Sequence, residues 1–234
     1  MITEMNRIRN RGWRPCRLLC LSLLLLLSPG GRAEDWDKRM QENGMVDVRT
    51  LDSTIQVRLA YATPVNFMSK AVYRGATKAW LHPDAARMLV RAQQYLREQH
   101  PGYTLLVYDA ARPMAVQRLM WEQVRGTPRA YYVSNPQKKN GRHNYGMAVD
   151  VTILDDTGRP LPMGTLFDYF GVEANTDRED ALLQAGRISR EDCENRRLLR
   201  SVMRRAGFTS ITSEWWHFNA CSSRTAQAKY RLIE

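Results

Sequence analysis

The stretch Gly141-Arg-His-Asn-Tyr-Gly-Met-Ala-Val-Asp150 joins a turn rich in Gly and Asn to an apolar run that continues to residue 154. The run from 146 to 154 has the length and composition of a buried β-strand. This pattern places His143 in the turn and Asp150 in the strand, so both side chains can point at one ion. Because imidazole and carboxylate groups are common zinc ligands, the stretch predicts part of a metal site beside a buried strand.

A second short stretch, Glu214-Trp-Trp-His217, supplies another carboxylate and another imidazole. His143, Asp150 and His217 would then form a three-ligand set, which leaves one coordination position of a catalytic zinc open for water. Glu214 lies three residues from a proposed ligand, where a general base could act on that water. The chain contains only 4 histidines, so half of them fall within these two patterns.

The spacing within the second stretch raises a geometric difficulty. We expect residues 210–219 to form the final strand, and side chains alternate between the two faces of a strand. Glu214 and His217 would then point to opposite sides, unless a bulge lies between them or the segment leaves the sheet. The alternative interpretation is that His143 is a surface loop residue and His217 a packed core histidine.

The remaining segments mix helical and strand patterns. Helices are predicted at 83–99, 113–124 and 189–206, strands at 55–59, 103–109, 146–154 and 210–219, and long loops at 61–78 and 163–187. Because these segments do not follow regular βαβ alternation, we expect an α+β fold with a central, largely antiparallel sheet flanked by helices. The length of 234 residues suits a single domain with a substantial core.

The first 33 residues have the features of a secretory signal peptide. An Arg-rich start precedes an apolar run from Leu18 to Leu27, and turn-forming and small residues lead to a cleavage site after Ala33. The apolar run is well short of the roughly 20 residues that cross a bilayer. We therefore expect a mature domain of residues 34–234 that has no membrane span and lies in the periplasm.

Removal of the predicted signal lowers the charge of the chain. Residues 1–33 contain six Arg and one Glu, so the formal net charge of +11 becomes +6. The remaining basic residues are scattered rather than clustered with stacking aromatic residues, which argues against nucleic acid as a partner. A mildly cationic surface suits work beside an anionic cell envelope.

Two of the 4 cysteines, Cys16 and Cys20, lie within the predicted signal peptide. Cys193 and Cys221 stay in the mature chain. In an oxidising compartment these two could form a disulfide. Two separate buried thiols are the equally good alternative.

Further motifs extend the pattern beyond the candidate metal site. They are Tyr61-Ala-Thr-x-x-Asn-Phe67, Asp109-Ala-Ala-Arg-Pro113, Pro162-Met-Gly-Thr-Leu-Phe-Asp168 and Asn195-Arg-Arg-x-Leu-Arg200. Together with the two stretches above, they make the chain resemble the zinc D-alanyl-D-alanine dipeptidases, the type associated with vancomycin resistance and cell-wall turnover. These belong to the D-Ala-D-Ala metallopeptidases related to the hedgehog signalling domain. The resemblance runs from about Val57 to Phe218.

The resemblance implies one zinc ion per chain, bound by the three ligands proposed above, with Glu214 as the catalytic base. It also implies that Arg112, in the turn after the buried strand, stabilises the developing oxyanion. A fixed guanidinium at a strand end would be a preorganised donor for such a charge. From the residues alone, Arg112 could equally be an ordinary surface arginine before a helix-starting proline.

The resemblance further implies that Tyr61 and Asp168 bind the free amino terminus of a dipeptide, whereas the residues alone suggest a core tyrosine and a loop-capping aspartate. The family often has a Ser pair just before the first histidine, which is thought to hold the substrate carboxylate. Gly141 and Arg142 stand there in this chain. Arg142 could replace the pair by a charge-assisted contact or could project into solvent. Tyr145 stands where an arginine is common.

The expected function is therefore hydrolysis of the dipeptide D-Ala-D-Ala in cell-wall peptide turnover. One alternative is a zinc D,D-carboxypeptidase or endopeptidase that trims peptidoglycan stem peptides. An alternative of another class is a non-catalytic envelope-binding module, which would need neither Glu214 nor Arg112. The secretion signal favours recycling over resistance, because a resistance dipeptidase would act on precursors in the cytoplasm.

Overall fold

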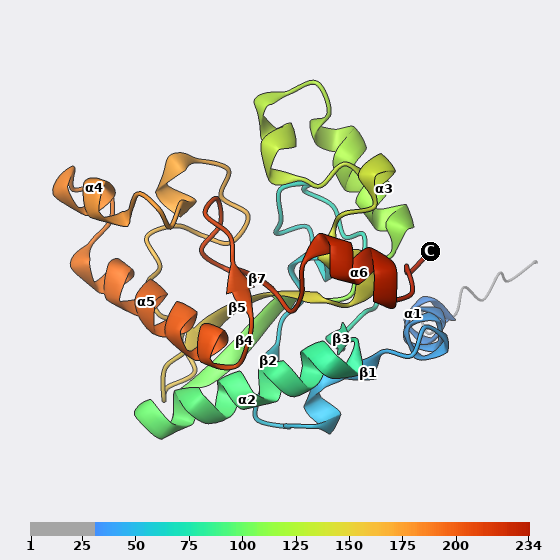
Figure 1. Ribbon diagram of the computed structural model, residues 1–234, viewed down its shortest axis with the longest axis horizontal. Helices are drawn as coiled ribbons and strands as arrows, with labels where there is room; N and C mark the ends of the chain where they lie inside the picture. Colours follow the sequence, from blue (N-terminus) through green and yellow to red (C-terminus); the bar gives the residue numbers. More distant parts are fainter. Residues whose placement is uncertain (1–30) are drawn as a thin grey trace, which may run out of the picture.

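The computed structural model describes residues 31–234, with side chains from Trp36 onward (Figure 1). Residues 1–30 of the predicted signal peptide lie outside the described residues, and the last three, 31–33, begin helix α1 (Gly31–Glu42). Among the described residues, no helix is both long and apolar enough to cross a bilayer.

The centre of the fold is a five-stranded sheet. Across the sheet the strands are β2 (Gln56–Val57), β4 (Thr104–Asp109), β5 (Ala148–Leu154), β7 (His217–Asn219) and β6 (Thr209–Ser210). Only the β2–β4 pair is parallel, so the sheet is largely antiparallel, as predicted. Strand β5 is buried along its whole length, which explains why its sequence is apolar except at Asp150 and Thr152. A separate two-stranded sheet pairs β1 (Val46–Asp47) with β3 (Trp80–Leu81).

The helices flank this sheet, which confirms the α+β prediction. They are α2 (Pro83–Gln99), α3 (Met114–Val124), α4 (Glu179–Gln184), α5 (Arg190–Arg205) and α6 (Ser223–Lys229). Helices α2 and α5 lie side by side, whereas α3 and the loop after it stand away from them (Figure 1). Pro83 opens α2, and a capping box between Ser189 and Asp192 opens α5.

Residues 210–219 do not form the single strand that we predicted. They form the end of β6, a loop at 211–216 and β7, and the two strands pair with each other as a hairpin. Thr209 pairs with Asn219 and Ser210 with Phe218. Because the chain turns back here, Glu214 lies in the hairpin loop and need not follow the alternation of a strand. The sequence pattern also missed the short helices α1, α4 and α6.

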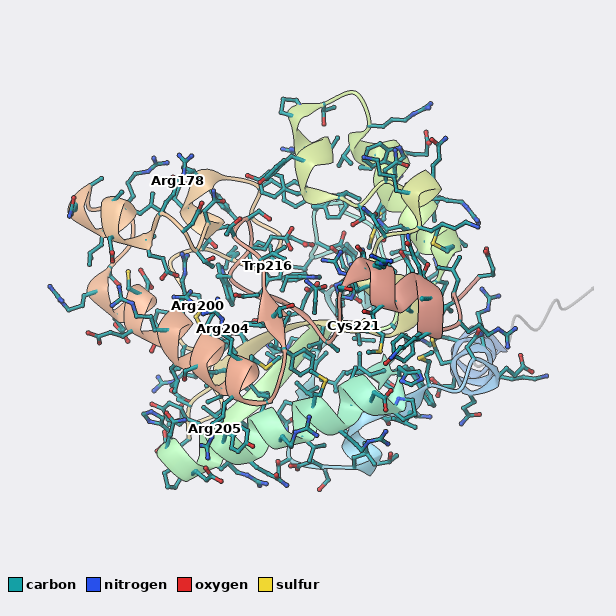
Figure 2. The ribbon with its side chains drawn as sticks, viewed as in Figure 1. Arg178, Arg200, Arg204, Arg205, Trp216 and Cys221 are labelled. Atoms are coloured by element: carbon teal, nitrogen blue, oxygen red, sulfur yellow. The ribbon has the colours of Figure 1, made fainter. Side chains whose placement is uncertain are left out.

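The core fills the space between the sheet and the helices, and Trp216 lies in its interior (Figure 2). Cys193 and Cys221 are not bonded to each other. Cys193 is a buried free thiol in α5, and Cys221 is a half-buried free thiol after β7 (Figure 2). The structure therefore has two separate thiols, the second of the two alternatives.

Candidate active site

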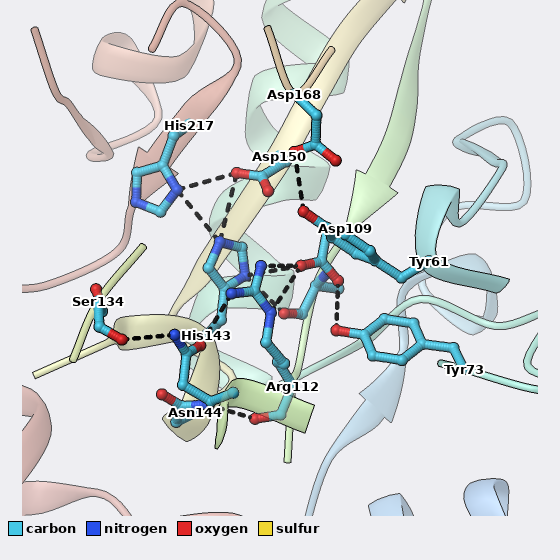
Figure 3. Close-up of polar contacts among 12 residues, drawn as sticks. Tyr61, Tyr73, Asp109, Arg112, Ser134, His143, Asn144, Asp150, Asp168 and His217 are labelled. Atoms are coloured by element: carbon cyan, nitrogen blue, oxygen red, sulfur yellow. Dashed lines mark hydrogen bonds and ion pairs between the residues drawn. The ribbon is translucent and has the colours of Figure 1, made fainter. Parts of the chain in front are cut away.

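Three potential metal ligands meet where β5 and β7 pair. Asp150 and His217 are direct cross-strand partners, and His143 approaches from the 3-10 turn Arg142–Tyr145 that precedes β5. Asp150 Oδ1 lies 2.9 Å from His217 Nδ1 and 3.4 Å from His143 Nε2 (Figure 3). The two facing ring nitrogens are 3.2 Å apart. All three side chains are buried, and they form a group that could hold a metal ion.

The spacing of these three atoms fits one small ion. Zinc binds nitrogen and oxygen ligands at about 2.0–2.1 Å in a tetrahedron, so adjacent ligand atoms lie about 3.3 Å apart. The three separations in the structure, 2.9, 3.2 and 3.4 Å, are close to that edge length. The donor set of two imidazoles and one carboxylate leaves the fourth corner to a water or a substrate.

Hydrogen bonds orient both imidazoles for this role. His143 Nδ1 lies 2.7 Å from the Ala110 carbonyl, and His217 Nε2 lies 2.8 Å from Asn219 Oδ1. A proton on each of these nitrogens leaves His143 Nε2 and His217 Nδ1 free to bind the ion. Burial alone would raise the pKa of Asp150, but the two histidines outweigh it and hold that pKa well below its usual range. Asp150 is therefore an anionic ligand.

Glu214 reaches the same pocket from the β6–β7 loop. Its side chain is buried, and burial raises its pKa to about 8, although His217 acts in the opposite direction. The negative charge of Asp150 adds to the rise. A carboxyl group with a pKa near neutrality can both accept and return a proton. The loop is fastened beside Glu214, because Trp215 Nε1 donates to Thr165 Oγ1 at 2.8 Å.

Arg112 is held in place by Asp109. A register shift between Val107 and Asp109 ends β4 irregularly and brings Asp109 opposite Asp150. Arg112 Nε donates to Asp109 Oδ2 at 3.1 Å, and Nη2 donates to the same oxygen (Figure 3). Burial alone would lower the pKa of Arg112, but Asp109 raises it well above its usual value, so the guanidinium stays charged.

Tyr61 and Asp168 form a pair on another wall of the pocket. Tyr61 donates its hydroxyl to Asp168 Oδ1 at 2.9 Å, and the Phe67 backbone N–H donates to Asp168 Oδ2 at 3.3 Å. Asp168 adopts a left-handed backbone conformation with φ of 62°. Burial raises the pKa of Asp168 to about 7, despite the hydrogen bond from Tyr61. This carboxyl group is therefore poorly compensated and can accept a cationic partner.

Arg142 lies on the pocket wall and does not project freely into solvent. Its Nε donates to Asn219 Oδ1 at 2.7 Å, and its Nη1 donates to the Asn140 carbonyl at 3.0 Å. Asn219 Oδ1 is the same atom that faces His217 Nε2. Arg142 is thus connected to a proposed metal ligand through one amide oxygen. Gly141 cannot easily carry a larger side chain, because a Cβ there would lie 2.6 Å from Asn144 Oδ1.

All eight side chains predicted from the sequence line one pocket with a volume of about 280 Å³. They are Tyr61, Arg112, Arg142, His143, Asp150, Asp168, Glu214 and His217. This volume is close to the lower end of the usual range for small-molecule sites, roughly 300 Å³. The interpretation of His143 as a surface residue is wrong, because its side chain is buried in this pocket.

Comparisons with known proteins identify the family of this chain. The model of the Peptidase M15 family, described as D-ala-D-ala dipeptidase, matches residues 41–232. The chain belongs to this family. Its relatives include the D-alanyl-D-alanine dipeptidase of Escherichia coli (strain K12), which is 32% identical over 174 residues, covering 74% of this chain and 83% of the relative.

Two further D-alanyl-D-alanine dipeptidases resemble this M15 peptidase. The protein of Enterococcus faecium is 31% identical over 174 residues, which cover 68% of this chain and 82% of the relative. The protein of Synechocystis sp. (strain ATCC 27184 / PCC 6803 / Kazusa) is 30% identical over 184 residues, which cover 64% of this chain and 72% of the relative. The M15 family is metal-dependent, in agreement with the three-residue group at this site.

Several side chains that support the site of this M15 peptidase were missed by sequence reasoning. Asp109 was visible in the Asp-Ala-Ala-Arg-Pro motif but was given no role, although it is the last residue of a predicted strand and precedes Arg112 by three positions. Gln117 accepts from Arg112 Nη1 at 2.9 Å, and Asn144 donates to the Arg112 carbonyl at 2.8 Å. Asn219 is the end of the last predicted strand. Nothing in the sequence links it to Arg142, 77 residues earlier.

Proposed function

We propose that this M15 peptidase is a zinc-dependent dipeptidase that hydrolyses D-Ala-D-Ala in cell-wall peptide turnover, with one zinc ion per chain. The observation that carries the proposal is the convergence of a metal-ligand group, a buried carboxyl group and a fixed guanidinium on one small pocket. The names of the relatives supply the substrate class.

The metal would be held by His143 Nε2, His217 Nδ1 and the Asp150 carboxylate. When bound, zinc would supply a Lewis acid that polarises the scissile carbonyl and makes a water molecule more acidic. The Ala110 carbonyl and the Asn219 amide fix the two imidazoles in the tautomer that this requires.

Glu214 would act as the general base and then as the general acid. Its carboxylate takes a proton from the water whose oxygen attacks the peptide carbonyl carbon. When the C–N bond breaks, Glu214 returns that proton to the leaving amine nitrogen. Burial raises the pKa of Glu214 in the metal-free protein, and the positive charge of a bound zinc ion would act in the opposite direction, towards the carboxylate that the first step needs.

Arg112 would stabilise the negative charge that develops on the carbonyl oxygen. Its guanidinium is buried, charged and fixed by Asp109 and Gln117, so little reorganisation is needed when the charge appears. A binding module would have no use for this arrangement beside Glu214. We therefore favour an enzyme over the envelope-binding alternative.

Tyr61 and Asp168 would hold the ammonium group of the substrate, and Arg142 would hold its carboxylate. A buried carboxylate that faces an ammonium explains a preference for free dipeptides over internal peptide bonds. Arg142 Nη2 makes no hydrogen bond to the described residues, whereas its Nε and Nη1 are engaged. The pocket then has a charged partner for each end of a dipeptide, which disfavours the longer stem peptides of the alternative enzyme.

The decisive experiment compares three substrates with purified, zinc-loaded protein. We expect turnover of D-Ala-D-Ala, and at least about a hundredfold lower kcat/KM for N-acetyl-D-Ala-D-Ala and for a pentapeptide stem, because both lack the free amine next to the scissile bond. Preferred cleavage of the pentapeptide would favour the carboxypeptidase alternative. Glu214→Gln should keep its zinc and lose about a thousandfold in kcat. Glu98→Gln, at an exposed position, is the matched control.

We also propose that residues 1–33 direct the chain to the periplasm, because of their Arg-rich start, apolar run and small-residue end. Fractionation of cells that express the full chain tests this. We expect a mature protein that begins at residue 34 in the periplasmic fraction. Full-length protein in the cytosol would contradict the proposal and would make a role on precursor pools the better interpretation.

A further inference from the structure

The Asn195-Arg-Arg-x-Leu-Arg200 motif has no part in the pocket, yet it touches the loop that carries Asp168. Arg196 lies on α5, is only 1% exposed and does not line the pocket. Its Nε and Nη2 both donate to the Met163 carbonyl, Nε at 2.8 Å, and Nη2 also donates to the Glu173 carbonyl at 2.8 Å. One guanidinium therefore joins two backbone positions that flank Asp168.

Further contacts hold the same segment of the loop against α5. Asn195 Nδ2 donates to the Pro162 carbonyl at 2.8 Å, one residue before Met163. Gly164 packs against α5 and the turn before it: a Cβ on Gly164 would lie 3.2 Å from Arg196 Nη2 on the helix and 2.9 Å from Ile188 Cγ2 in the turn. The first residues of loop 162–173 therefore pack directly against α5.

Arg196 is itself fixed by buried charge. Its Nη1 has no hydrogen-bond partner among residues 31–234 and lies 3.9 Å from a carboxylate oxygen of Glu179, which is also buried. Arg200 donates to both oxygens of Glu179 at 2.7 Å and points toward α4 (Figure 2). The four-residue spacing of the two arginines on α5 thus lets Arg196 bind the backbone of the loop that carries Asp168, while Arg200 binds Glu179.

Between its anchored ends, the loop is partly exposed and makes an inward turn at Asp168. Leu166 is 84% exposed, whereas Asp168 points inward with a φ of 62° and accepts the Tyr61 hydroxyl. Asn and Asp adopt this conformation more readily than other non-glycine residues, and surrounding contacts help to hold it. Arg196 provides such contacts at both ends of the segment.

We propose that Arg196 and Asn195 are positioning residues for substrate specificity: by closing the ends of loop 162–173 onto α5, they hold Asp168 where it meets the amino group of the substrate. This inference rests on the proposed function for the role of Asp168, but the anchoring itself does not. Arg196 touches none of the three metal ligands, so its effect falls on substrate binding rather than on the chemical step.

The test uses Arg196→Lys, with Arg197→Lys as the matched control one position along the same helix, where the side chain is exposed. A lysine keeps the charge but lacks the planar fork that spans two carbonyls. We expect Arg196→Lys to raise KM for D-Ala-D-Ala about tenfold, with kcat changed less than about twofold, and to narrow the preference for D-Ala-D-Ala over its N-acetyl form about tenfold. If Arg196 only stabilised the fold, less of the Arg196→Lys protein would be active, so the apparent kcat would fall while KM stayed unchanged. That result would overturn the proposal.

Two further measurements cover the other outcomes. If Arg196→Lys does not fold, Asn195→Ala, which removes a single hydrogen bond, serves as the test instead. We expect it to raise KM for D-Ala-D-Ala in the same direction but only about threefold. Wild-type kinetics in Asn195→Ala would refute the proposal. Hydrogen–deuterium exchange of peptide 162–174 reports on the anchoring without activity. If exchange is faster in Arg196→Lys than in Arg197→Lys but the wild-type protein does not cleave D-Ala-D-Ala, the anchoring role of Arg196 stands and the proposed function is rejected.

Discussion

Asp109 and Arg112 form a buried ion pair three residues apart, in which two nitrogens of the guanidinium share one carboxylate oxygen. The other oxygen of Asp109 accepts the Tyr73 hydroxyl at 2.9 Å. Asp109 is completely buried, so no water can replace either contact. The position of the proposed oxyanion donor therefore depends on a residue that does not line the pocket.

Replacing Asp109 by Asn should leave the buried guanidinium without its countercharge. We expect the free energy of unfolding to fall by about 3–5 kcal/mol and kcat/KM to fall about a hundredfold. Urea unfolding and dipeptide hydrolysis measure the two effects. Glu122→Gln is the matched control, since Glu122 pairs with Arg125 at the same spacing but on the surface. Equal losses in the two variants would contradict this role for Asp109.

Removal of a metal ligand should weaken zinc binding more than removal of the group that orients this ligand. We expect His217→Ala to lose zinc binding, whereas Asn219→Ala should bind zinc about 10 to 100 times more weakly, because the imidazole loses its orienting acceptor. Zinc titration with a competing chelator measures both. His100→Ala, which changes a histidine outside the pocket, should bind zinc like the wild type. Full zinc stoichiometry in His217→Ala would exclude it as a ligand.

The raised pKa of Asp168 predicts a pH dependence of stability in the metal-free protein. Burial raises this pKa from 3.8 to about 7, so the folded state binds the proton more tightly than the unfolded chain does. The contribution of Asp168 to the free energy of unfolding should therefore fall as pH rises from about 4 to about 7, by up to about 4 kcal/mol, and this contribution should then level off.

Asp168→Asn tests this directly, because an amide does not titrate and Asn tolerates the left-handed conformation. Urea unfolding at pH 5 and pH 8 should show a smaller loss of stability in the variant than in the wild type. Asp180→Asn, at an exposed position on α4, should retain the wild-type difference. Identical pH profiles for Asp168→Asn and the wild type would rule out the raised pKa.

Arg142 should matter only for substrates that carry a free carboxylate. With wild-type protein we expect KM to rise about tenfold when D-Ala-D-Ala is replaced by its C-terminal amide. In Arg142→Met the two substrates should have similar KM values, both near that of the amide in the wild type. Lys138→Met removes an exposed cation from the same segment as a control. An unchanged preference for the carboxylate in Arg142→Met would place the recognition elsewhere.

Local sequence patterns were sufficient for the elements that carry the site. The strand pattern at 146–154 and the Pro83 helix start predicted β5 and α2, because apolar periodicity and capping depend on neighbouring residues. Motif spacing selected four of the eight pocket residues, His143, Asp150, Glu214 and His217. The other four, Tyr61, Arg112, Arg142 and Asp168, were selected only through the resemblance to the dipeptidase family. The fold class followed from the irregular order of helices and strands.

The tertiary structure decided how those residues meet. The difficulty over Glu214 and His217 disappeared because Ser210 pairs with Phe218, and this pairing turns a predicted strand into a hairpin. The hydrogen bonds of Arg142 to Asn219 and of Arg196 to Met163 join residues 77 and 33 positions apart. By itself, the sequence determined which groups are available and which elements bear them. Only the folded chain decided their hydrogen-bond partners, because burial, register and side-chain contacts arise between segments whose local patterns carry no information about each other.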